Sequence, residues 1–135
     1  MSQRFSTALA MAAASVVLFG TAASAEPCVS CRLDSSQPCV SPGERFQLTL
    51  CLRNDCRDIR FATATVVALL PDGSRVEFGS GTMELIGGSG WQCVDRVIPV
   101  PPRAPEGTYT ILVTGTSQDE DFGCEMPVEV LPECN

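Results

Sequence analysis

Eight cysteines constrain the fold of this chain more than any other feature. All of them follow residue 27: Cys28, Cys31, Cys39, Cys51, Cys56, Cys93, Cys124 and Cys134. An even number of cysteines in a small exported domain indicates a disulfide framework. A bridge that closes a loop of tens of residues stabilises the folded state by about 3 kcal/mol, because it restricts the unfolded chain. We therefore expect structural disulfide bonds.

The first 25 residues predict export. Arg4 provides a basic start, residues 8–20 form an apolar run, and Ala23-Ser24-Ala25 is a small-residue cleavage pattern. This order is typical of a secretory signal peptide, and the run is shorter than the roughly 20 apolar residues of a membrane span. We expect residues 1–25 to be removed. The mature chain, with no membrane span, then lies in the periplasm or outside the cell.

The pairing of the cysteines stays open at this point, because eight cysteines allow on the order of 100 pairings. Cys51 and Cys56 flank a short turn at a strand end, so we expect a local bridge between them. Cys134 is expected to return to the group of three N-terminal cysteines. Cys93 and Cys124 then pair with each other, or one of them takes the remaining N-terminal partner.

Cys28 and Cys31 form a CxxC motif, which has two functional interpretations besides structural bridges. Thiol-redox chemistry needs the motif at the start of a helix, where the helix end lowers the thiol pKa. An acidic residue and a proline precede the motif here, and no helical pattern follows it. A zinc site would need a second pair of ligands at suitable spacing, which Cys51 and Cys56 do not offer. Structural bridges are favoured.

The composition excludes several kinds of catalytic site. The chain has no histidine and no lysine, so it cannot form Ser-His, Cys-His or Ser-Lys couples. Its 16 acidic and 9 basic residues give a net charge of −7, which repels phosphate and argues against nucleic acid as a partner. No pattern places two carboxylates across a cleft. We therefore expect a protein that is not an enzyme and has no cofactor.

Alternation of apolar and polar residues predicts an all-β fold. Residues 45–53 place four apolar side chains on one face and Cys51 on the other, so a bridge from Cys51 should cover the outward face. Pro71-Asp72-Gly73 predicts a tight turn, and residues 117–123 a polar hairpin loop. The other expected strands are residues 58–70, 75–78, 82–86, 94–100, 107–116 and 124–131.

About seven strands separated by turns predict a single antiparallel β-sandwich over residues 41–135. A cysteine-rich N-terminal segment, residues 26–40, precedes it. Pro127 indicates an edge position for the last strand, because proline cannot donate to a strand ladder.

Three segments resemble the immunoglobulin-like and fibronectin type III-like sandwich modules of exported bacterial proteins. They are residues 42–46 (PGERF), 69–73 (LLPDG) and 104–111 (APEGTYTI), and the resemblance covers about residues 41–131. It implies that Tyr109 forms a tyrosine corner, with its hydroxyl bonded to backbone near the preceding proline-rich crossover. The eight cysteines depart from the cysteine-poor pattern of such modules. A fold of this kind does not assign a function.

Two further features are candidate sites. Trp91 is expected to pack over the bridge of Cys93, and the alternative is an exposed ring that stacks on a sugar or a peptide. Asp119, Glu120 and Asp121 are expected to form a solvated hairpin tip, and the alternative is a Ca²⁺ site.

The sequence therefore predicts a binding or structural module that recognises another envelope or extracellular protein. The alternatives are a thiol-redox protein that uses Cys28 and Cys31, and a Ca²⁺-dependent ligand-binding domain.

Overall fold

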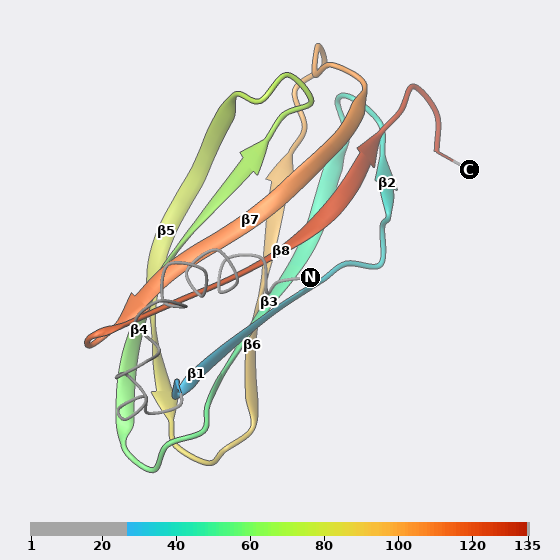
Figure 1. The fold of residues 1–135 in the computed structure, drawn as a ribbon. Coiled ribbons are helices and arrows are strands. Elements are labelled where there is room, and N and C mark those ends of the chain that lie inside the picture. The colour runs from blue at the N-terminus through green and yellow to red at the C-terminus, as the bar shows by residue number, and fades with distance from the viewer. Residues whose placement is uncertain (1–26, 135) are drawn as a thin grey trace, which may run out of the picture.

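The fold is built from β-strands. The computed structural model describes residues 27–134, so the expected leader lies outside the described residues, and within them no helix occurs. Figure 1 shows the strands. Their bounds are β1 Val29–Asp34, β2 Cys39–Val40, β3 Arg45–Asn54, β4 Ile59–Leu69, β5 Arg75–Ile86, β6 Trp91–Pro99, β7 Gly107–Ser117 and β8 Glu120–Val130.

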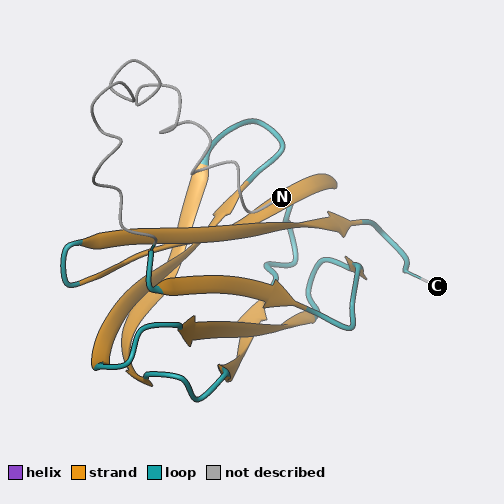
Figure 2. Cartoon of the chain, turned by 60° about the horizontal axis from the view of Figure 1, so that its bottom comes forward, coloured by secondary structure: helices purple, strands orange, loops and turns teal. Residues whose placement is uncertain are grey.

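The strands form two sheets. One has three strands in the order β1-β3-β6, and the other has five in the order β2-β8-β7-β4-β5. All neighbours are antiparallel except β2, which makes a short parallel pair with β8. Figure 2 shows the strands joined by short loops. The expected disulfide-bonded β-sandwich is confirmed.

The alternation of β3 explains the core between the sheets. Phe46, Leu48, Leu50 and Leu52 are all buried, as expected for one face of a half-buried strand. Apolar residues of β4, β7 and β8 meet them from the opposite sheet, so that two apolar clusters fill the interior. On β7, the alternating residues Tyr109, Ile111 and Val113 are buried as well.

The structure differs from the predicted strands in three places. Residues 75–78 and 82–86 belong to one continuous strand, β5, which carries a bulge opposite Val66 and Val67. The expected loop 117–123 contracts to a turn at Gln118 and Asp119, because β8 begins at Glu120. Residues 29–34 form β1, which pairs with β3 along its whole length, so the N-terminal segment is part of the sandwich.

One local prediction holds, and a second holds in part. At the turn between β4 and β5, the Asp72 carboxylate accepts hydrogen bonds from the Ser74 amide (2.9 Å) and hydroxyl (2.6 Å), and Gly73 has a φ of 92°. The Ser74 hydroxyl and amide lower the pKa of Asp72. The sheet order places β2 outside β8, so β8 is not the outermost strand; β2 pairs only with Glu129 and Val130, however, and Pro127 lies in the part of β8 that has no partner among the described strands on this side.

Four disulfide bonds use all eight cysteines of the described chain. The pairs are Cys28–Cys56, Cys31–Cys124, Cys39–Cys134 and Cys51–Cys93. The return of the C-terminal cysteine to the N-terminal group is correct, and so is the second of the two alternatives for Cys124, which takes an N-terminal partner.

The expected local bridge between Cys51 and Cys56 is wrong. Cys51 lies directly opposite Cys93 in the β3–β6 register, and both side chains are on the outward face of the sheet. Cys56 lies beyond the end of β3. There the Asp55 amide donates to the Cys28 carbonyl at 2.8 Å, which brings Cys28 to the turn. Register therefore decided both pairs.

Candidate functional site

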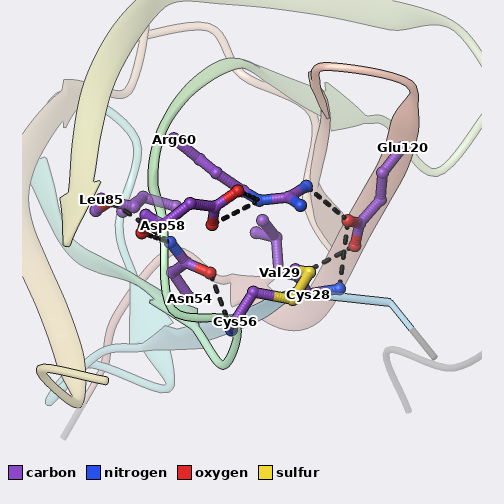
Figure 3. Close-up of polar contacts among 8 residues, drawn as sticks. All are labelled: Cys28, Val29, Asn54, Cys56, Asp58, Arg60, Leu85 and Glu120. Atoms are coloured by element: carbon purple, nitrogen blue, oxygen red, sulfur yellow. Dashed lines mark hydrogen bonds and ion pairs between the residues drawn. A yellow bond between two sulfur atoms is a disulfide. The ribbon is translucent and has the colours of Figure 1, made fainter. Parts of the chain in front are cut away.

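Glu120 connects the start of β1 to the five-stranded sheet. Its carboxylate accepts hydrogen bonds from the backbone amides of Cys28 (3.1 Å) and Val29 (2.9 Å). The Arg60 guanidinium lies 3.5 Å from the same carboxylate. Figure 3 shows Glu120 reaching toward these groups from β8. Because Cys28 and Val29 are buried, water cannot fully replace the carboxylate as an acceptor.

A second set of polar contacts extends this network to the end of β3 (Figure 3). Arg60 contacts both carboxylate oxygens of Asp58, at 3.0 and 3.1 Å, and this hydrogen bonding lowers the pKa of Asp58. The buried Asn54 amide donates to the carbonyls of Asp58 (2.9 Å) and Leu85 (3.3 Å) and accepts from the Cys56 amide (3.0 Å). These contacts fix the connection between β3 and β4.

The three carboxylates of the β7–β8 hairpin do not converge on one point. Glu120 faces inward toward β1, whereas Asp119 and Asp121 are exposed. In residues 27–134 no group of three or more acidic or cysteine side chains has the geometry to hold a metal ion. Glu120 is engaged in the contact with β1, so the hairpin offers few free ligands to Ca²⁺, which takes six to eight oxygens.

The CxxC motif does not close on itself. Cys28 is bonded to Cys56 and Cys31 to Cys124, and the motif begins β1 where redox chemistry would want a helix. Its two cysteines face two different elements, so they anchor β1 at two points.

Trp91 lies between two arginines on the outward face of the three-stranded sheet. The guanidinium carbons of Arg32 and Arg53 are 4.5 and 4.6 Å from the ring centroid, which is the geometry of cation–π contacts. The register places Trp91 on the same face as Cys93 and the bridge to Cys51. Trp91 therefore lies on the side of the Cys93 bridge, as expected. Its contacts with the two arginines could not be expected from spacing along the chain, because these arginines come from β1 and β3.

Tyr109 is buried at the start of β7. Its hydroxyl donates a 2.6 Å hydrogen bond to the carbonyl of Pro105. This is the contact of a tyrosine corner, which the resemblance implies for Tyr109. Burial, and secondarily the charge of Asp72, raise the pKa of Tyr109 above its ordinary value of 10.0.

An exposed apolar patch lies on the outer face of β4 and β5. Ile59, Phe61 and Ile86 are 55%, 60% and 51% exposed, and Ile59 and Ile86 are direct register partners. We call these three residues the outer patch. The outer patch is not among the sites expected from the sequence, although alternation in residues 58–70 places Ile59 and Phe61 on the face opposite the buried Ala62.

The sandwich is open along one side, between β5 and β6. β5 is the last strand of its sheet and β6 the last strand of the other. Between them lies a cleft with a volume of about 200 Å³, lined by apolar side chains of the core and by the exposed Thr82, Val94 and Arg96. A second, smaller apolar cleft has a volume of about 120 Å³, and its lining includes Val76 and Phe78 of β5 and Ile98 of β6. We call this side the open edge.

Comparisons with known proteins identify the fold. No family model matches the chain, and neither does any curated protein. Among solved structures, a CARDB domain from Pyrococcus furiosus in complex with di-metal ions has a TM-score of 0.60 at 14% identity, covering 76% of this chain and 87% of that one.

Within residues 27–134, no helix is long and apolar enough to cross a membrane.

Two further structures are similar over parts of larger proteins. The sporulation control protein Spo0M from Bacillus subtilis has a TM-score of 0.55 at 15% identity, covering 78% of this chain and 50% of that one. The alkylpurine DNA glycosylase AlkC from Pseudomonas fluorescens has a TM-score of 0.59 at 16% identity, covering 76% of this chain and 30% of that one. At these identities the likeness is one of fold, and the chain shares a β-sandwich fold with the CARDB domain.

Proposed function

We propose that this chain is an exported, non-catalytic binding module whose partner is another protein of the cell envelope or the extracellular space. The outer patch carries the proposal. Its three large apolar side chains each expose half or more of their surface on a sheet whose other face forms the core. Clustered exposed apolar residues on a rigid scaffold favour contact with another protein.

Two observations support the remaining parts of the proposal. The leader pattern and the four disulfide bonds favour an oxidising compartment. The chain has no histidine or lysine, and its described cysteines are all bridged, so imidazole, amine and free thiol groups cannot act as its nucleophile or general base.

Photo-crosslinking in the source organism tests the proposal. A photoreactive amino acid replaces Phe61 in one variant and Val97 in a matched control. Val97 is 52% exposed and lies on the outward face of the opposite sheet. We expect a discrete crosslinked protein from position 61 only. Equal crosslinking from both positions, or none from either, would contradict a binding role for the outer patch.

A further inference from the structure

The backbone of β5 is available for pairing along its outer edge. β5 pairs with β4 on one side, and no strand of residues 27–134 pairs with its other side. The bulge opposite Val66 and Val67 interrupts β5, so the regular unpaired segment of β5 is residues 79–83. A regular edge of this kind is a template for an added strand.

Gln92 reveals which backbone groups point outward. Its side chain accepts from the Ile86 amide at 2.8 Å and donates to the Glu84 carbonyl at 2.9 Å, as a neighbouring strand would. Hydrogen-bonding groups alternate along an antiparallel strand, so the amides and carbonyls of Thr82 and Ser80 point to the same side. Gln92 covers only the end of β5, so the backbone of Ser80 and Thr82 stays unpaired on this side in the described chain. Both Ser80 and Thr82 are exposed.

The open edge offers apolar contacts next to these groups. The larger cleft is lined by Leu50, Leu52 and Met83, and the exposed Val94 lies at its rim. β5 has small residues at Gly79, Ser80 and Gly81, so these three positions leave their part of the cleft unfilled. An added strand places alternate side chains over the cleft, because side chains alternate between the two faces of a sheet.

Arg96 adds a charge to this surface. It is exposed, and its guanidinium lies 3.3 Å from the point where a Cβ on Gly81 would be. No carboxylate among the described residues pairs with it, although the chain has a net charge of −7. A cation at the rim of an apolar cleft favours a partner that supplies a carboxylate.

We propose that the open edge binds an extended peptide segment of a partner protein, which adds to β5 as a further strand through the backbone of Ser80 and Thr82, places apolar side chains in the cleft and directs a carboxylate to Arg96. The proposal rests on the proposed function, because the strand must come from a partner. It adds the mode of recognition, which is β-strand addition.

A second copy of this chain fits the open edge less well. If β5 of another copy added here, residues 79 and 81 of that copy, both glycines, would face the cleft and leave it unfilled. A peptide with larger alternating apolar residues fills the cleft, so we commit to this occupant.

A library of displayed nine-residue random peptides tests the proposal, with the folded, disulfide-bonded protein as the target. We expect enrichment of alternating apolar residues with one Asp or Glu. A synthetic peptide of the enriched sequence should bind about tenfold more weakly to Thr82→Pro, which removes the outward amide. Thr82→Ala keeps this amide and should bind as the wild type does.

Two more measurements complete the test. Arg96→Gln should weaken the acidic peptide about fivefold and leave its Asp→Asn or Glu→Gln counterpart unchanged. In the wild type, peptide binding should slow amide exchange at Ser80 and Thr82. Ser80→Pro is the alternative should Thr82→Pro fail to fold.

The outcomes separate this proposal from the proposed function. A library with no binder, or binders that do not distinguish Thr82→Pro from Thr82→Ala, overturns the open edge as a peptide site. A dimer that Thr82→Pro dissociates also overturns it, because the occupant is then a second copy. If Phe61 crosslinks to a partner in either case, the proposed function stands without the open edge.

Discussion

Replacing Glu120 by alanine should destabilise the protein by about 3 kcal/mol. The carboxylate accepts two backbone hydrogen bonds, from Cys28 and Val29, and each bond to a charged group contributes about 1.5 kcal/mol. Both donors are buried, so their loss is not fully offset by water. Arg60 adds little to the loss because it keeps Asp58 at 3.0 Å.

Urea unfolding of the oxidised protein measures this free energy, and the melting temperature should fall by about 12 °C. Amide exchange at Cys28 and Val29 should accelerate, although the disulfide from Cys28 to Cys56 keeps the start of β1 in place. Glu120→Gln keeps one acceptor oxygen and should lose about half as much. Asp121→Ala, on the same hairpin but exposed, should lose about 0.5 kcal/mol or less.

The reasoning is refuted if Glu120→Ala unfolds within about 0.5 kcal/mol of the wild type and the two amides exchange at the wild-type rate. That result would mean that the two amides find water or another acceptor, and that the carboxylate does not hold β1.

Three further outcomes are expected. Adding Ca²⁺ should leave the melting temperature unchanged, because Glu120 is engaged with β1; a rise of several degrees in a thermal scan would contradict this. Cys31→Ser with Cys124→Ser should cost about 4 to 5 kcal/mol in urea unfolding, because this bridge closes a separation of 93 residues; a cost near zero would mean that the sheets hold together without it. Tyr109→Phe should cost about 1 kcal/mol through the lost bond to Pro105. The raised pKa of Tyr109 means that wild-type stability is kept below pH 10 and falls as the pH rises above it; Tyr109→Phe should lack this alkaline loss, which absorbance titration and unfolding at pH 9 to 12 measure.

Local patterns predicted most of the strands. The alternation around Phe46 to Leu52 and the turn at Asp72 and Gly73 each rest on residues within a few positions of one another, so the sequence contains the whole signal. The contact of Tyr109 with Pro105 is local for the same reason.

The cysteine pairs depend on register between distant strands. Cys51 meets Cys93 because β3 and β6 pair at that position, and spacing along the chain does not contain this information. The same holds for Trp91, whose two arginines come from different strands. Such contacts become predictable only when the strand order is known.

Glu120 is a different case, because its orientation was within reach. Cys124 and Val128 face the core from β8, and stepping back by two residues from Cys124 gives Phe122 and then Glu120 on the same face. Starting the last strand at residue 124 hid this parity. Asp119, Glu120 and Asp121 were all expected at a solvated hairpin tip. One of the three carboxylates, that of Glu120, instead faces inward and supports the fold.

The two sides of the sandwich are closed by different means. On the side of β1 and β8, the bridge from Cys31 to Cys124 and the Glu120 carboxylate join the two sheets. On the side of β5 and β6, the Gln92 side chain of β6 forms hydrogen bonds with the backbone of Glu84 and Ile86 in β5. Because the disulfide bond and the Glu120 contacts join the two sheets on the side of β1 and β8, the fold does not depend on close packing between β5 and β6. A chain of this size can then leave a sheet edge and a cleft exposed without losing its fold. A partner strand at the open edge would then complete a surface that the covalent framework leaves free.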